Sequence, residues 1–298
     1  MPPETQEMPE TLKPYLFHGL SFVWNKTKKD VVAECPFCGK AKFSVKVENG
    51  VYRCFGCEEK GNSSVFIQKL YALAEEIGTT TSQYETLRKN RGLLSITPLI
   101  LWGVQKHPLL DEWLIPGFNI ENKLCSLYRY MTVDGKKRLA ATSTLGHQLF
   151  LSSDFDKKKE ALIITEGVWD AMALHETLSQ ARFDETDNII ETNDIKSSLW
   201  SDFNIVAIPG CNSYKEVWNP LFAGKIVYIA FDNDHPRTNP NNGKSIPPAG
   251  LEGVKRTVKL MSQAKEPPLE IRYLKWGHDH YNLDLPSGFD VRDLLTTH

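Results

Sequence analysis

The stretch 161-ALIITEGVWDAMAL-174 decides the fold of the larger part of this chain. Its first five residues form a continuous apolar run, as expected of a parallel strand that is buried on both faces. Glu166 and Gly167 end the run, and apolar residues at helical spacing then predict a helix over 168–179. A strand, a tight turn and a helix in this order form the unit from which parallel sheets are built.

The same pattern continues toward the C-terminus. A helix is predicted over 251–261, and the Pro- and Asn-rich segment 235–248 has no periodicity and is predicted to be a loop. Further strands are predicted from the apolar runs NIVAIPG (204–210), KIVYIAFD (225–232) and EIRYLKW (270–276). Strands that alternate with helices predict an α/β domain with a parallel sheet over residues 159–298.

Three carboxylates follow two of these strands. Glu166 ends the first run, and Asp232 and Asp234 end the run that begins at Lys225. The carboxyl ends of parallel strands form the ligand crevice of an open sheet, and residues at i and i+2 face the same side. Clustered carboxylates suit Mg²⁺ or Mn²⁺, which serve phosphoryl transfer. Taken singly, the Asp pair also fits a turn and Glu166 also fits a helix N-terminus.

A second decisive stretch is 35-CPFCGKAKFSVKVENGVYRCFGC-57. An Asn-Gly pair at 49–50 predicts a type I′ turn between two strands, which brings the two Cys-x-x-Cys pairs together. Four thiolates complete a tetrahedral, structural zinc site. An iron site, a disulfide pair or four buried thiols are the alternatives. The predicted zinc ligands are Cys35, Cys38, Cys54 and Cys57.

This cysteine-rich module also carries basic and aromatic side chains. Lys42 and Arg53 are candidates for nucleic-acid contact, and Phe43, Tyr52 and Phe55 could stack on bases. The aromatic rings fit the core of a small ribbon equally well.

The remaining patterns predict the organisation of the chain. A helix follows the cysteines over 65–77, a Thr- and Ser-rich break follows it, and hairpin signals stand at 119–122 and 134–135. The predicted layout is a zinc-ribbon domain with its helix (11–77), a linker (78–83) and a catalytic domain (84–298), which comprises a mixed α+β basic subdomain (84–158) and the parallel-sheet subdomain (159–298).

Composition excludes some classes of protein. The 298 residues have a formal net charge of −2, so any nucleic-acid contact requires a local basic surface. Residues 1–10 form a polar leader without the apolar core of a signal peptide, and no run is long enough to span a membrane. The clustered cysteines do not resemble a secreted disulfide framework, and Cys125 and Cys211 are expected to be buried thiols. We therefore expect a cytoplasmic protein, in the host cytoplasm if phage-encoded.

From about residue 30 to residue 295 the chain resembles the replicative primases of bacteria and phages that join a zinc ribbon to a TOPRIM catalytic domain. The ribbon segment 35–62 and the motifs ITEGVWDAMAL, IPG (208–210), IAFDND and LPSGFDVRDLL (285–295) carry the resemblance. The set of four cysteines is closest to phage primase–helicases, since the bacterial enzymes commonly have a histidine ligand.

The resemblance implies DNA-templated synthesis of short primers. It assigns Glu166 to the chemical step or to metal binding, Asp232 and Asp234 to Mg²⁺ or Mn²⁺, and Asp290 to a later acidic position with Asp293 close to another. Asp170 matches a recurrent aspartate whose role is expected to be packing.

The resemblance also implies partners. Segment 121–150 matches a basic subdomain that contacts template and nucleotide, with Arg129, Lys136, Lys137 and Arg138 as candidates. The expected partners are single-stranded DNA, nucleoside triphosphates and a replicative helicase. The sequence has no P-loop, so the helicase is expected as a separate chain or a missing part.

Two rival functions stay open. One is a metal-dependent TOPRIM nuclease, and the other is a zinc-ribbon accessory protein that only binds single-stranded DNA. In the primase interpretation, flexibility at 78–82 lets the ribbon swing onto the active site.

Overall fold

The computed structural model describes residues 8–24, 27–142, 144–183, 189–192, 198–277 and 281–296. Residues 1–7 of the predicted leader and the last two residues of the predicted catalytic domain lie outside the described residues. None of the described helices is long and apolar enough to cross a membrane.

Contacts divide the chain into two compact units, of residues 1–80, 104–118 and 123–148, and of residues 81–103, 119–122 and 149–298. The first contains η1 (Glu10–Leu12), α1 (Lys13–Phe17), β1 (Asp30–Ala33), β2 (Phe43–Lys46), β3 (Tyr52–Cys54), β4 (Lys60–Gly61), α2 (Ser63–Ile77), β5 (Gln105–Lys106), β6 (Trp113–Phe118), β7 (Leu124–Val133) and β8 (Lys136–Ala140). The predicted domain bounds 11–77 and 84–298 stay a prediction, because compactness does not test which part folds alone.

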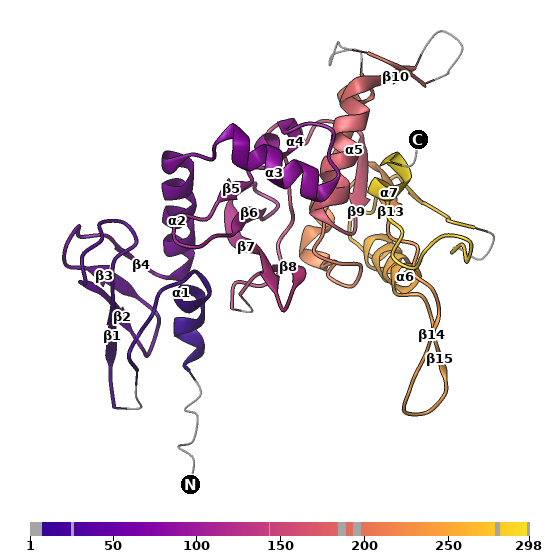
Figure 1. The fold of residues 1–298 in the computed structure, drawn as a ribbon. Coiled ribbons are helices and arrows are strands. Elements are labelled where there is room, and N and C mark those ends of the chain that lie inside the picture. Colours follow the sequence, from indigo (N-terminus) through magenta and orange to yellow (C-terminus); the bar gives the residue numbers. More distant parts are fainter. Residues whose placement is uncertain are drawn as a thin grey trace. The chain divides into compact units, whose positions relative to one another are not determined.

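The second unit contains the remaining elements, and Figure 1 labels its α-helices and several of its strands. They are α3 (Thr81–Arg91), α4 (Thr97–Leu101), β9 (Ala161–Thr165), α5 (Val168–Gln180), β10 (Ala181–Phe183), β11 (Ile189–Glu191), η2 (Leu199–Ser201), β12 (Phe203–Ala207), η3 (Glu216–Leu221), β13 (Ile226–Ala230), β14 (Arg237–Thr238), β15 (Ser245–Ile246), α6 (Ala249–Ser262), β16 (Glu270–Tyr273) and α7 (Val291–Thr296). The predicted 78–83 linker therefore overlaps α3.

The cysteine-rich part of the first unit is an antiparallel sheet with strand order β1-β2-β3-β4. The predicted hairpin is present between β2 and β3, but the predicted type I′ turn is wrong. Only Gly50 of the Asn-Gly pair has a positive φ, at 67°. The side chain of Asn49 accepts a hydrogen bond from the Val51 N–H at 3.1 Å, and the Gly50 N–H bonds the Lys46 carbonyl instead. A side chain that bonds its own backbone thus selects a wider turn.

The second sheet of this unit has the order β5-β6-β7-β8, and all of its strands are antiparallel. Both predicted hairpin turns are found. Asn122 has a φ of 61° between β6 and β7, and Asp134 and Gly135 have φ values of 50° and 72° between β7 and β8. Two successive positive φ values define the type I′ turn that matches strand twist.

The second unit is built on a four-stranded parallel sheet with the order β12-β9-β13-β16. All four strands come from the apolar runs that predicted them. The register aligns Thr165, Ala207 and Ala230, so β9, β12 and β13 end at one edge of the sheet. The zinc-ribbon region, the antiparallel β5–β8 sheet and the parallel sheet confirm the predicted fold class.

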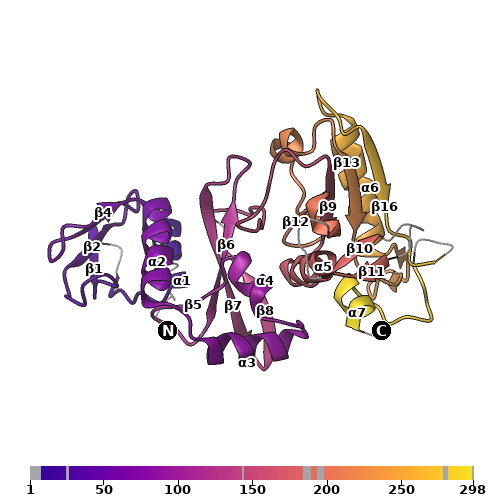
Figure 2. The ribbon, with the colours of Figure 1, turned by 90° about the horizontal axis from the view of Figure 1, so that it is seen from above.

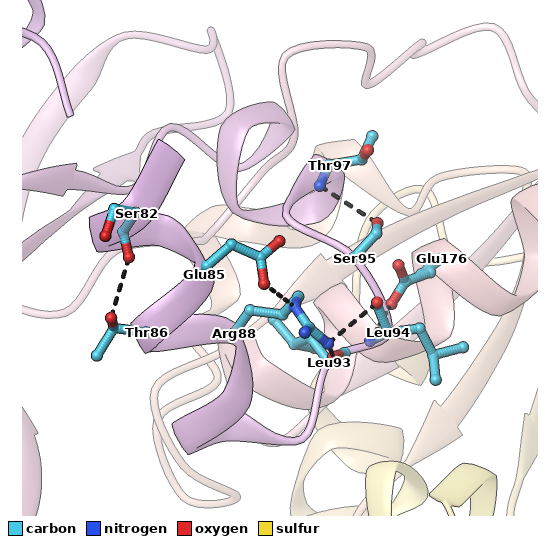
Figure 3. Close-up of polar contacts among 9 residues, drawn as sticks. All are labelled: Ser82, Glu85, Thr86, Arg88, Leu93, Leu94, Ser95, Thr97 and Glu176. Atoms are coloured by element: carbon cyan, nitrogen blue, oxygen red, sulfur yellow. Dashed lines mark hydrogen bonds and ion pairs between the residues drawn. The ribbon is translucent and has the colours of Figure 1, made fainter. Parts of the chain in front are cut away.

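A network of polar contacts anchors the C-terminal part of helix α5 (Figure 3). Glu176 is buried on α5 and accepts the Leu94 N–H at 2.9 Å. The Arg88 guanidinium on α3 donates to the carbonyls of Leu93 at 2.9 Å and Leu94 at 3.2 Å, and pairs with Glu85 at 2.9 Å. The turn between α3 and α4 is therefore held from both sides, which fixes α5 along the sheet.

The segment 235–248 is not the unstructured loop that its composition predicted. Strands β14 and β15 pair as a short antiparallel hairpin, with Arg237 opposite Ile246. Its strands are only two residues long and lie on the surface, which explains why no apolar alternation marks them in the sequence.

Candidate metal centres

Four cysteine sulfurs converge between the turns of the ribbon. Sγ of Cys35 lies 3.8 Å from that of Cys57, and Sγ of Cys38 lies 3.7 Å from that of Cys54. All four ligand atoms lie within 4.8 Å of one another, and none of the cysteines is in a disulfide. Zinc–sulfur bonds of about 2.3 Å place tetrahedral sulfurs roughly 3.8 Å apart, so the site fits zinc with no open position.

The backbone around the sulfurs explains the two nearby glycines. Gly39 has a φ of 71°, and its N–H donates to the Cys35 carbonyl. A Cβ on Gly56 would lie 3.3 Å from the Cys38 sulfur, and the Gly56 N–H donates to Sγ of Cys54 at 3.3 Å. Although burial opposes ionisation, backbone N–H groups lower the pKa of Cys54 to about 7, which favours the thiolate that binds metal.

Glu166 stands immediately after β9, where the chain turns into α5. Its carbonyl accepts the Gly210 N–H at 2.9 Å, so the IPG segment closes over the turn. Burial, with a contribution from the charge of Asp234, raises the pKa of Glu166. Oε2 of Glu166 is buried and has no hydrogen-bond partner among the described residues. A buried carboxylate oxygen without a partner is costly, so this atom is available for a ligand.

Asp232 and Asp234 follow β13 at the same edge of the sheet. Burial raises the pKa of Asp232 to about 9, and the neighbouring carboxylates Glu166, Asp170 and Asp290 add to the shift. Glu166 and Asp234 also repel each other, as the raised pKa of Glu166 records. The structure therefore brings the predicted acidic residues into one electrostatic cluster.

The first turn of α6 fixes Asp234. The Gly250 N–H donates to Oδ2 of Asp234 at 2.8 Å, and a Cβ on Gly250 would lie 2.5 Å from the Asp232 carbonyl oxygen. Only glycine allows the helix to approach this closely. The free N–H groups and the positive end of the helix dipole favour a carboxylate at this position.

Asn233, between the two aspartates, is a residue that the sequence did not single out. It is fully buried, its Nδ2 donates to the carbonyls of Asn282 at 2.9 Å and Pro286 at 3.2 Å, and its Oδ1 accepts the Asn282 N–H at 2.8 Å. Its backbone also pairs with Phe289. Strand alternation was the available signal, because it places Asn233 on the face opposite the two aspartates.

Asp290, a predicted metal ligand, lies in a more constrained setting. Its Oδ2 accepts from Arg292 at 2.5 Å and its Oδ1 accepts the Asp293 N–H at 2.8 Å. Burial and the neighbouring Asp290 raise the pKa of Asp170 to about 8. Oδ1 of Asp170 has no hydrogen-bond partner among the described residues. Asp170 is thus part of the acidic cluster and not only a packing residue of α5.

The carboxylates are not gathered as tightly as the sulfurs. In the part of the chain that the structure describes, the cysteines are the only group of three or more metal-ligating side chains whose ligand atoms all lie within 4.8 Å. Carboxylates that raise one another's pKa repel, and a divalent cation offsets this repulsion.

The predicted basic residues differ in their surroundings. Lys136, Lys137 and Arg138 are exposed on β8, and Lys42 and Arg53 are exposed on the ribbon. Arg129 is different, because its side chain is only 13% exposed and pairs with Glu112.

The aromatic side chains of the ribbon also differ in how far they are exposed. Phe43 and Tyr52 are fully buried and stack with ring centroids 4.8 Å apart. Phe55 is 63% exposed, and the Arg53 guanidinium lies 5.1 Å from its ring centroid. Of the three predicted stacking rings, Phe55 alone has a surface that a base can reach.

Residues 21–84 match the family model described as the CHC2 zinc finger, the zinc ribbon of the DnaG type. This segment contains all four predicted ligands, and β1–β4 and α2 all lie within it. No curated protein matches the sequence.

Solved primase structures are similar to this chain at low sequence identity. The zinc-binding and RNA polymerase domains of the Aquifex aeolicus primase are 14% identical, with a TM-score of 0.44 over 97% of this chain and 80% of that one. The primase fragment of the bacteriophage T7 primase–helicase is 13% identical, with a TM-score of 0.42 over 92% and 94%. A DnaG catalytic core is 12% identical, with a TM-score of 0.49 over 78% and 75%.

Proposed function

Since residues 21–84 form a zinc ribbon of the DnaG-type primases, we propose that the chain is a DNA primase. In this proposal it synthesises short oligonucleotide primers on single-stranded DNA by metal-dependent nucleotidyl transfer. The observation that carries the proposal is the cluster of Glu166, Asp232 and Asp234, which follow the carboxyl ends of the adjacent parallel strands β9 and β13. The same chain also contains the zinc ribbon.

Glu166, Asp232 and Asp234 are the proposed ligands of the catalytic Mg²⁺ or Mn²⁺, with Asp290 beside them. The unpartnered Oε2 of Glu166 and the raised pKa of Asp232 fit a site that a divalent cation completes. When bound, such an ion activates the attacking oxygen and stabilises the departing pyrophosphate. The contact from Gly250 keeps Asp234 in place during this step.

The chain's own groups position the reactants. In the reaction, the primer's 3′-oxygen forms a bond to the α-phosphorus of the incoming nucleotide, and the bond to the bridging oxygen breaks as pyrophosphate leaves. We also assign Glu166 to accept the hydroxyl proton, through the carboxylate oxygen that does not bind the cation, because the side chain lies at the strand edge and its pKa is raised.

Template and nucleotide contacts are assigned to exposed cations. Lys136, Lys137 and Arg138 are consecutive exposed residues of β8, and Lys42 and Arg53 are exposed on the ribbon, with Phe55 available for base stacking. Phosphate contacts of this kind weaken as salt rises. A replicative helicase, as a separate chain or a further segment, is the proposed protein partner.

One assay separates this function from its rivals. Single-stranded DNA, labelled nucleoside triphosphates and Mg²⁺ or Mn²⁺ are incubated with the full chain, and the products are resolved on a sequencing gel. Short products made without a primer support a primase. Shortened template supports a nuclease, and a mobility shift without either product supports an accessory protein.

A further inference from the structure

The zinc ribbon and the β5–β8 sheet share one apolar core through α2. Figures 1 and 2 both show α2 between the two sheets. Phe66, Ile67 and Leu70 of α2 are fully buried in a cluster that also contains Leu114 of β6 and Leu127 of β7. The same cluster contains the ribbon's own Phe43 and Tyr52, so a single helix serves both sheets. Two parts that share a close-packed core do not slide independently.

A polar clamp joins the same two parts at the end of α1. The Arg129 guanidinium on β7 pairs with both carboxylate oxygens of Glu112, at 2.5 and 2.7 Å, and also donates to the carbonyl of Phe17. Its carbon lies 4.7 Å from the centroid of the Phe17 ring. Charge-assisted bidentate pairs fix geometry, and Phe17 ends the helix that packs on the ribbon.

The segment of η1 and α1 is also tied to the ribbon by side-chain hydrogen bonds. The Tyr15 hydroxyl donates to the Gly50 carbonyl in the ribbon hairpin at 2.5 Å, and the Thr11 hydroxyl donates to the Val47 carbonyl at 2.6 Å. Arg129 therefore grips an element that cannot move without the ribbon.

Two buried histidines continue the junction beyond Phe17. Nδ1 of His18 lies 3.4 Å from Nε2 of His107, and the rings are stacked. Nδ1 of His107 accepts the Leu109 N–H, so its proton sits on Nε2 and points at His18. Beside them, a Cβ on Gly19 would lie 3.0 Å from Leu110, so the two chain segments are in close contact.

The predicted linker is held as well. The Thr79 hydroxyl donates to Oε1 of Gln105 at 2.9 Å and accepts the Lys106 N–H at 2.8 Å. Earlier on α2, Nε2 of Gln68 donates to the Leu124 carbonyl at 3.0 Å. The body of α2 and the segment that follows the helix are therefore both bonded to the part of the chain that carries the β5–β8 sheet.

We propose that the ribbon and the β5–β8 sheet move as one rigid module, and that Arg129 is the positioning residue that holds them in register. The sequence led us to expect that the ribbon swings about residues 78–82. In this proposal the ribbon does not swing there. Lys42 and Arg53 then keep a fixed spacing from the cations of β8 when a template strand binds. Only this last consequence rests on the proposed primase function.

Pulsed electron–electron spin resonance on the full, zinc-loaded chain tests this directly. Nitroxides are attached to p-acetylphenylalanine in place of Glu48 on the ribbon and Thr132 on β7, which are both exposed. The doubly labelled chain with Arg129 intact is expected to give one narrow distance distribution. Arg129→Gln is expected to broaden this distribution roughly two-fold, because the ribbon loses the contact at Phe17 that restrains its motion. Zinc content should stay unchanged in Arg129→Gln, which separates lost positioning from lost folding.

The matched control is Lys106→Gln, which removes an ion pair with Asp111 within the same sheet and touches no ribbon residue. It should leave the distribution narrow. Should Arg129→Gln not fold, Glu112→Gln tests the same clamp more gently. A broad distribution without any clamp substitution, or an unchanged one in the clamp variants, overturns the proposal. A narrow distribution in a chain that makes no primers would overturn the proposed function and leave this inference standing.

Discussion

The backbone N–H of Gly250 donates to Oδ2 of Asp234 at 2.8 Å, and the absence of a side chain on Gly250 is what permits this contact. Gly250→Ala is expected to push α6 away from Asp232, whose carbonyl would lie 2.5 Å from the new Cβ. The expected cost is about 1–3 kcal/mol in the free energy of unfolding. Urea titration measures it, with Ala249→Ser as the control. Equal midpoints for the two variants would contradict the close approach.

Asp232→Asn is expected to lower primer synthesis by roughly 100-fold or more, because it removes a proposed ligand of the catalytic cation. Template affinity should change little, since the basic residues lie elsewhere. Primer yield on a gel and fluorescence anisotropy with labelled single-stranded DNA measure the two effects. Asp284→Asn, at an exposed aspartate, is the control. Normal primer yield from Asp232→Asn would refute the assignment.

The pH dependence of stability follows from the raised pKa of Asp232, about 9 against an ordinary 3.8. Between these values the unfolded chain binds fewer protons at this site than the folded chain. Stability without added Mg²⁺ or Mn²⁺ therefore falls as pH rises, by up to about 1.4 kcal/mol per pH unit for this group. Asp232→Asn removes the effect, so its stability advantage should widen between about pH 6 and pH 9. Calorimetric melting curves of both proteins across that range measure the gap, and a constant gap would count against the raised pKa.

Cys54→Ser is expected to abolish tight zinc binding, because three sulfurs and a hydroxyl do not replace a tetrahedral thiolate set. Structural zinc sites supply on the order of 10–16 kcal/mol of binding free energy, so the ribbon should unfold. A colorimetric zinc assay and proteolysis of the ribbon segment test this. Cys125→Ser, which leaves the four ligands intact, is the control and should bind one zinc per chain, as the unsubstituted protein should. Full zinc content in Cys54→Ser would point to a different ligand set.

Replacing Lys136, Lys137 and Arg138 by glutamine is expected to weaken single-stranded DNA binding and to flatten its salt dependence. Each lost phosphate contact lowers the slope of log K against log salt by about 0.7. Binding isotherms at several salt concentrations give the slope. The matched control replaces three exposed cations of α6, Lys255, Arg256 and Lys259. An equal change in both triple variants would mean that only net charge matters.

The features that could be predicted from the sequence are those that depend on residues close together in the chain. The zinc ligands were found because their spacing is short, and the parallel strands because each is one apolar run. It could not reach contacts between distant residues: Arg129 and Phe17 are 112 positions apart, and Asn233 finds its partners 49 and 53 positions later. The family resemblance made Arg129 a candidate for template and nucleotide contact, whereas its partners in the fold are a carboxylate and a carbonyl.

The order in which a ribosome makes the chain gives Asn233 a further meaning. All four cysteines of the ribbon are synthesised early, so zinc can bind before the strands of the parallel sheet have been made. The amide of Asn233 and the carboxyl of Asp290 belong to a set that closes only after residues 282–293 have been added. The acidic cluster is therefore assembled last, and the growing chain passes most of its synthesis without the complete set of carboxylates.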